Sequence, residues 1–198
     1  PRTWGALFYM LLSLATGILY FTTVVTGLSM SAGLAILIIG VPFVILFIGV
    51  VRVLSLVEGR IVEVLLGERM PRRPLYADRS LSVLARIQAM FTDPRTWSTM
   101  LYLGLMLPLG TIYFTVAVTG VSLSFGFVIA AIAQALEAMG VGGLHVQSDL
   151  TMWLPQWLST PVLFVLGFLM LFVLLHVARA VGMMHAALAK NLLVKSGG

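Results

Sequence analysis

The sequence predicts an all-α integral membrane protein with four transmembrane helices, arranged as two repeated hairpins with an amphipathic cytoplasmic linker. Apolar residues make up 60% of the 198 residues and charged residues only 10%, against about 25% charged in soluble domains. No Asp, Glu, Lys or Arg occurs in residues 3–51, 96–136 or 150–178. Because about 20 apolar residues cross the hydrocarbon core, the first run holds two spans and each of the others holds one.

An internal repeat supports the two-hairpin arrangement. The tetrapeptide at residues 1–4 recurs at residues 94–97, a shift of 93 positions. Without a gap, residues 1–33 share 17 identities with residues 94–126. The identical pairs include Tyr9 with Tyr102, Gly17 with Gly110 and Tyr20 with Tyr113. Such similarity is far beyond chance, so the sequence predicts a duplicated membrane unit.

The first hairpin is expected over residues 1–57. Its first span covers residues 4–26, and its second covers residues 34–57. Between them, residues 27–33 are rich in glycine and serine, which favours a tight turn on the outer side.

The linker is expected over residues 58–93. Residues 58–66 continue the second span as an amphipathic helix, which Gly67 ends, and a second amphipathic helix runs over residues 78–91. Apolar positions at helical spacing beside arginines suit a helix on the inner leaflet. They also suit a helix packed on a partner protein, so both interpretations stay open.

The second hairpin is expected over residues 94–198. Its spans cover residues 97–119 and 161–178. An insertion that the first half lacks, residues 130–160, is expected to form an external loop. A cytoplasmic helix is expected over residues 179–195.

The distribution of positive charge predicts the orientation. All twelve Lys and Arg residues flank the same ends of the four predicted spans, whereas Glu137 and Asp149 lie at the opposite ends. This positive-inside pattern places both termini and the linker in the cytoplasm. The net charge of +5 is therefore a topology signal, and nucleic acid is not an expected partner. Candidate contacts with anionic lipid or a partner protein are Arg60, Arg69, Arg72, Arg73, Arg79 and Arg86.

Polar residues near the predicted outer ends form a second candidate group. They are Tyr20, Thr26, Ser29 and Ser31 in the first repeat and Tyr113, Thr119, Ser122 and Ser124 in the second. Small residues and hydroxyls allow close helix packing and satisfy backbone groups in a membrane. The tyrosines also suit an interfacial aromatic belt. The functional alternative is a polar ligand or lipid pocket made jointly by the two repeats.

Catalysis and metal binding are not expected. The chain has no cysteine, and its three histidines, His145, His176 and His185, lack the convergent ligands that a metal site needs. His176 is expected to form a hydrogen bond across the helix bundle. The serines lack a nearby base, so no enzymatic activity and no cofactor is expected. No charged residue is expected at mid-membrane, which argues against a transporter.

Three segments together resemble a known family. They are the repeated hairpin that begins at Trp4 and Trp97, the sequence at residues 66–71 followed by the restart at residues 93–97, and the closing residues 178–190. They resemble the "putative sensor" membrane domain at the amino terminus of some bacterial histidine kinases. The resemblance implies a four-span input module in the bacterial cytoplasmic (inner) membrane. No phosphoacceptor helix or ATP-binding lid occurs in this sequence.

The favoured hypothesis is a non-catalytic sensory or regulatory module. It would relay an external or membrane-borne stimulus to a cytoplasmic or membrane protein partner. Membrane lipid is a further expected partner, and the sequence leaves open whether the chain forms a homo-oligomer. The alternative is a structural or accessory subunit of a larger membrane complex. A small transporter or lipid-binding protein ranks below both.

Overall fold

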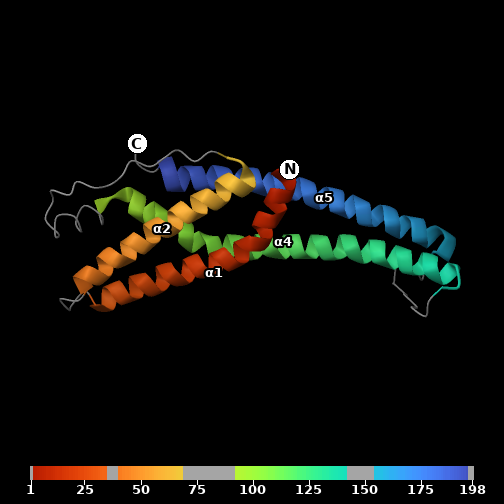
Figure 1. Cartoon of the computed structure of the whole chain (residues 1–198), viewed down its shortest axis with the longest axis horizontal. Coiled ribbons are helices and arrows are strands. Elements are labelled where there is room, and N and C mark those ends of the chain that lie inside the picture. Colours follow the sequence, from red (N-terminus) through yellow and green to blue (C-terminus); the bar gives the residue numbers. More distant parts are fainter. Residues whose placement is uncertain (1, 35–39, 69–91, 142–153, 196–198) are drawn as a thin grey trace. The chain divides into compact units, whose positions relative to one another are not determined.

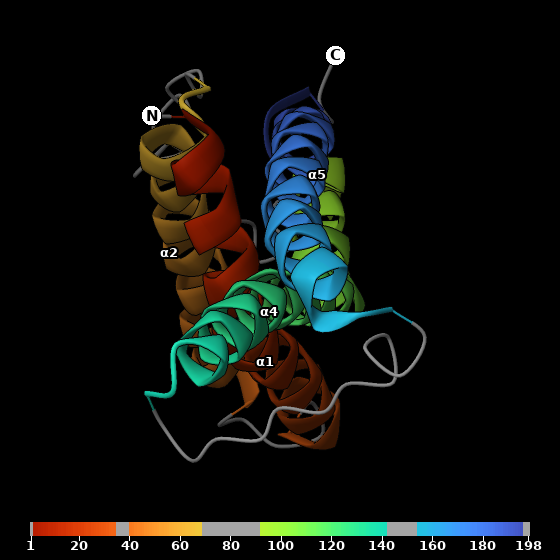
Figure 2. The ribbon, with the colours of Figure 1, turned by 90° about the vertical axis from the view of Figure 1, so that its right-hand side faces the viewer.

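The computed structural model describes residues 2–34, 40–68, 92–141 and 154–195. Within these ranges the chain is all-helical, without strands, and Figure 1 and Figure 2 show its long helices. They are α1 (Arg2–Leu34), α2 (Gly40–Leu66), α4 (Pro94–Ala138) and α5 (Gln156–Lys190), the last followed by the π-helical turn η2 (Asn191–Lys195). Among the described residues, four helices are long and apolar enough to cross a membrane. The predicted all-α class with four helices able to span a membrane is therefore confirmed.

The chain forms two compact units. The first unit comprises residues 1–114 and 179–198, and the second comprises residues 115–178. Helices α4 and α5 therefore contribute to both units. The first unit contains α1, α2, the start of α4 and the end of α5, and it holds most of the buried polar side chains.

Helix α1 continues through the turn expected at residues 27–33, so that prediction is wrong. In a membrane, a helix satisfies its own backbone groups, which outweighs the turn tendency of Ser and Gly. Gly27 is buried against the ring of Phe47, where a Cβ atom would overlap it. Residues 35–39 lie outside the described chain, and α2 begins at Gly40.

Helix α1 is bent in its amino-terminal half (Figure 1). The Ser13 hydroxyl donates to the Met10 carbonyl at 2.6 Å, and Thr16 donates to the Ser13 carbonyl at 3.2 Å. Hydroxyls bonded to carbonyls of the preceding turn often bend helices. Ser13 and Thr16 lie between Tyr9 and Tyr20 in sequence, and a bend at these hydroxyls helps the two tyrosine side chains to reach a common partner.

Helix α2 ends at Leu66, as the sequence predicted. Gly67 has a φ of 73°, and its N–H donates to the Glu63 carbonyl at 3.1 Å. This is a left-handed glycine cap. The expected linker residues 58–66 are thus the last part of α2, and residues 69–91, with the second amphipathic helix, lie outside the described residues.

Two glycines bring α1 and α4 into close contact in the first unit. A Cβ atom on Gly17 would overlap the Met106 backbone, and one on Gly110 would overlap the Ser13 backbone. The shift of 93 positions between the two similar segments relates Gly17 to Gly110 and Ser13 to Met106. The contact of Gly17 with Met106 is therefore equivalent to the contact of Gly110 with Ser13. Small residues allow such close approach of membrane helices. Gly17 and Gly110 are thus explained as packing residues.

The second unit is a hairpin of the later part of α4 with the earlier part of α5. Helix α4 reaches Ala138 and α5 begins at Gln156. The insertion expected at residues 130–160 is therefore helical at both ends, while residues 142–153 lie outside the described residues. Inside the unit, a Cβ atom on Gly167 would lie 2.9 Å from the Ser124 carbonyl oxygen, so the helices are in close contact.

The second unit also has a polar contact near its helix ends. The buried Gln134 accepts hydrogen bonds at its Oε1 from Ser159 and Thr160, each at 3.1 Å. Gln156 donates to the Gln134 carbonyl at 3.1 Å. These bonds hold the start of α5 against α4.

Candidate functional site

The candidate site is a polar cluster around Glu58 inside the first unit. In α2 the buried positions run along one face: Val44, Phe47, Ile48, Val51, Ser55, Glu58, Val62 and Leu66. These spacings of three and four residues follow the helical period. Glu58 therefore occupies a core position, and it is fully buried at 0% exposure.

Three tyrosine hydroxyls donate to the Glu58 carboxylate. Tyr9 and Tyr102 donate to Oε1 at 2.7 and 3.1 Å, and Tyr20 donates to Oε2 at 2.9 Å. Tyr9 and Tyr20 come from α1, whereas Tyr102 is the repeat counterpart of Tyr9 in α4. The three donors replace the water that a carboxylate needs, because an unpaired buried charge is strongly unfavourable.

His185 from α5 completes the cluster and is also fully buried. Its Nε2 lies 2.5 Å from the Tyr9 hydroxyl oxygen and 2.8 Å from that of Tyr102. The same atom lies 3.7 Å from Glu58 Oε1. Each tyrosine hydroxyl has one proton, and both donate it to Glu58. Nε2 therefore carries a hydrogen and donates to the two hydroxyl oxygens.

The second ring nitrogen of His185 is not satisfied. Among the residues that the structure describes, its Nδ1 is buried and has no hydrogen-bond partner. The Tyr113 ring meets the imidazole edge-on, with centroids 5.7 Å apart and planes at 87°. A buried polar atom without a partner is unusual in a native protein and calls for an explanation.

The cluster lies near one set of helix ends. Tyr9 and Tyr102 follow the starts of α1 and α4 by seven and eight residues, and Glu58 and His185 precede the ends of α2 and α5 by eight and five. At a rise of 1.5 Å per residue, these four residues lie about 8–12 Å along the helix axis from the nearest ends of their helices. By the predicted orientation, these are the cytoplasmic ends. We refer to Tyr9, Tyr20, Glu58, Tyr102 and His185 as the Glu58 cluster.

The composition of the Glu58 cluster suits hydrogen bonding and not metal binding. Within residues 2–34, 40–68, 92–141 and 154–195, no three His, Cys, Asp or Glu side chains could hold one ion. Glu58 and His185 lie just beyond the predicted spans at residues 34–57 and 161–178, yet both side chains are fully buried. Buried ionisable residues with specific partners are candidates for a functional site.

Two of the candidate pocket residues belong to this region. Tyr20 is in the cluster, and Tyr113 is buried against His185. The aromatic-belt interpretation therefore does not hold for either, since both are buried.

The other pocket candidates are arranged differently. Thr26 and Ser29 are exposed in the first unit, where Ser31 is half-buried. Thr119 and Ser122 are exposed in the second unit, and buried Ser124 donates to the Gly120 carbonyl at 2.7 Å. The joint pocket remains a prediction.

Among the candidate linker arginines, Arg60 is exposed and forms a 2.9 Å salt bridge with Glu63. The remaining five, Arg69, Arg72, Arg73, Arg79 and Arg86, lie outside the described residues, as does His145. His176 is exposed and its Nδ1 is 2.9 Å from the Phe172 carbonyl of its own helix. The expected bond from His176 across the bundle is therefore wrong.

Sequence reasoning missed Glu58 and His185. It ended the second span at residue 57 because charged residues follow, although the buried face of α2 continues at the same period to Leu66. The repeat identity of Tyr9 and Tyr102 was a partial signal for the site, because a buried tyrosine hydroxyl at either position needs a hydrogen-bond partner.

These features define a multi-pass membrane protein with a buried ionisable cluster. The sequence model of the "Putative sensor" family matches residues 9–193, which include the whole Glu58 cluster. The chain belongs to this family, as its resemblance implied, and is a sensor domain in that general sense. No curated protein and no solved structure matches the chain.

Proposed function

We propose that this chain is a non-catalytic sensory module of the bacterial inner membrane, with both termini in the cytoplasm. It relays an external or membrane-borne stimulus to a cytoplasmic partner, and the Glu58 cluster couples its helices. One observation carries the proposal: a single buried carboxylate is bonded by hydroxyls from α1 and α4, with a histidine of α5 beside it.

The physics of such a network supports two discrete states. Buried donors are satisfied only over a narrow range of distances and angles, so helices joined by them move between packings and do not slide continuously. A stimulus shifts the populations only if it interacts differently with the two states. The unsatisfied Nδ1 of His185 favours a second arrangement in which this atom gains a partner.

The end of α5 provides an output. His185 lies five residues before the end of α5, and the next turn is the π-helix η2. In η2, the Leu192 carbonyl accepts a hydrogen bond from Ser98 of α4 at 2.7 Å. Short π-helical segments frequently occur at functional sites. A movement of His185 against the tyrosines therefore displaces the carboxyl-terminal end of α5 relative to α4.

Spin labels test the two-state element. Since the chain has no cysteine, a pair of introduced cysteines at the exposed Val64 and Met184 reports the distance between α2 and α5. In liposomes we expect two distance populations, with their ratio changed by Glu58→Gln. Tyr113→Phe is the control, because no hydrogen bond joins its hydroxyl to Glu58. One population, unchanged by Glu58→Gln, would refute the coupling role.

The relay is tested separately in cells of the source bacterium. Deleting residues 70–90 removes most of the linker while keeping all described helices. Transcript profiles of the gene deletion and of the linker deletion are compared with wild type. We expect the linker deletion to reproduce the profile of the gene deletion. A wild-type profile in cells with normal levels of the shortened protein would reject a relay through the linker.

A further inference from the structure

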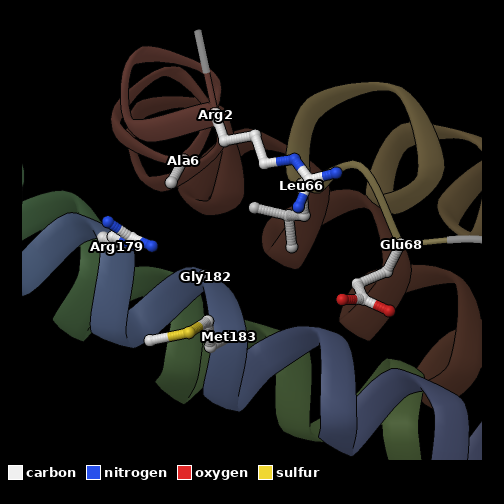
Figure 3. Close-up of a pocket in the computed structure, with 7 residues that line it drawn as sticks. All are labelled: Arg2, Ala6, Leu66, Glu68, Arg179, Gly182 and Met183. Atoms are coloured by element: carbon white, nitrogen blue, oxygen red, sulfur yellow. The ribbon is translucent and has the colours of Figure 1, made fainter.

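A charged cavity lies in the first unit where α1 begins, α2 ends and α5 passes them. Its volume is about 120 Å³, which corresponds to about four water molecules at roughly 30 Å³ each. Figure 3 shows Arg2 from α1, Glu68 just beyond α2 and Arg179 from α5 around it. The remaining wall is mostly apolar and includes Leu66 and Met183.

The three charged side chains of the cavity are not paired with one another. Within the described residues, none of the salt bridges includes Arg2, Glu68 or Arg179. The Arg2 side chain lies along the end of α2, because a Cβ atom on Gly67 would be 3.4 Å from its Nε. Two guanidinium groups and one carboxylate thus face a small space without neutralising each other.

We propose that this cavity binds the headgroup of an ethanolamine phospholipid, with the phosphate between Arg2 and Arg179 and the ammonium at Glu68. Guanidinium groups bind phosphate through paired hydrogen bonds. The ammonium has N–H donors for the carboxylate, whereas a choline group has none. The site goes beyond the proposed function and holds even if the chain is not a sensor.

The depth of the cavity fits a headgroup. Trp4, two residues after Arg2, is 59% exposed, as expected for a side chain of the interfacial aromatic belt. Arg179 is the first charged residue after the uncharged run of residues 150–178. Arg2 and Arg179 therefore flank the predicted spans at residues 4–26 and 161–178. The volume accommodates a polar headgroup, and the acyl chains remain in the bilayer.

The cavity is one helical turn from the Glu58 cluster on two helices. Gly182 lines it together with Ala6, and a Cβ atom on Gly182 would be 3.1 Å from the Ala6 Cβ. Three residues further along each helix are His185 and Tyr9, which contact each other. A bound headgroup that moves α1 from α5 here would alter that contact, and this coupling alone rests on the proposed function.

Native mass spectrometry of the full chain in detergent micelles tests the site by titration with defined lipids. We expect phosphatidylethanolamine to bind more tightly than phosphatidylcholine. The double variant Arg2→Gln/Arg179→Gln should lose affinity for phosphatidylethanolamine by at least about tenfold, since charge-assisted hydrogen bonds are lost. Glu68→Gln should remove the preference for ethanolamine over choline and retain phosphate binding.

Arg60→Gln is the matched control, because Arg60 is exposed and paired with Glu63 outside the cavity. It should bind lipid as the wild type does. Arg2→Lys/Arg179→Lys keeps the charges and should show an intermediate loss, which separates binding from folding; circular dichroism checks the helix content of each variant.

Four results would overturn the site: equal binding of ethanolamine and choline lipids, wild-type binding by the double Gln variant, wild-type selectivity in Glu68→Gln, or displacement of the lipid by millimolar inorganic phosphate. The last would assign the arginines to a free anion. Binding that leaves the Val64–Met184 distances unchanged would count against the sensory coupling and not against the site.

Discussion

Replacing Glu58 by leucine should strongly destabilise the first unit. Leucine fills much of the volume but accepts no hydrogen bond, so the acceptor for three tyrosine hydroxyls disappears. One of Tyr9 and Tyr102 can turn its proton to His185 Nε2 if the imidazole changes tautomer. Tyr20 has no such alternative, because its bond goes to Glu58 Oε2.

The expected loss of free energy of unfolding is about 1–3 kcal/mol for each tyrosine hydroxyl that is left buried without an acceptor. Unfolding in mixed micelles with increasing SDS, followed by circular dichroism, measures it. Glu63→Leu is the control on the same helix. Within the part of the chain that the structure describes, Glu63 pairs with the exposed Arg60, so its replacement should change stability by less than about 1 kcal/mol.

A double-mutant cycle identifies the source of the loss. Tyr20→Phe alone should destabilise by about 1–3 kcal/mol, because it removes one hydrogen bond to a charged group. In the Glu58→Leu background the same change should be neutral or stabilising, since it removes an unsatisfied donor. Additive effects, or a Glu58→Leu variant as stable as the wild type, would refute the hydrogen-bond network.

Three further outcomes are expected in the same unfolding assay. Gly17→Leu should separate α1 from α4 and lower the free energy of unfolding by more than about 2 kcal/mol, as overpacking does. The control Gly104→Ala has open space at its Cβ position, so it should be neutral or slightly stabilising. Equal effects of the two variants would contradict the close contact of α1 with α4. Gln134→Leu should destabilise by about 1–3 kcal/mol because Ser159 and Thr160 lose their acceptor, and Gln156→Leu, which spares that side-chain oxygen, should have the smaller effect. Gly67→Ala should lower the free energy of unfolding by about 1 kcal/mol, because the φ of Gly67 is 73° and alanine is strained there. A stabilising effect would contradict the role of Gly67 as the cap of α2.

The helices were predictable because hydropathy and charge directly reflect the bilayer. Uncharged runs located four spans, and the end of α2 at Gly67 followed from glycine chemistry. The turn expected at residues 27–33 was wrong, since the tendency of Ser and Gly to form turns in water does not apply where the helix must satisfy its own backbone.

The site was only partly predictable. The repeat marked Tyr20 and Tyr113 as equivalent, but local sequence could not reveal that Tyr9 and Tyr20 converge on one carboxylate in another helix. His185 is 176 residues from Tyr9, and nothing in the spacing of the histidines indicates this contact. The continuous buried face of α2 was the one available signal for Glu58.

The Glu58 cluster has paired donors and a single acid. Tyr9 and Tyr102 occupy equivalent positions in two segments of similar sequence, whereas Glu58 and His185 each occur once, on α2 and α5. Two identical hairpins associating as a homodimer would bring two carboxylates together at this place, and like charges oppose ionisation of both. Joining two similar segments in one chain allows a carboxylate on α2 to lie beside an imidazole on α5, an arrangement that does not bring a second carboxylate to the same place.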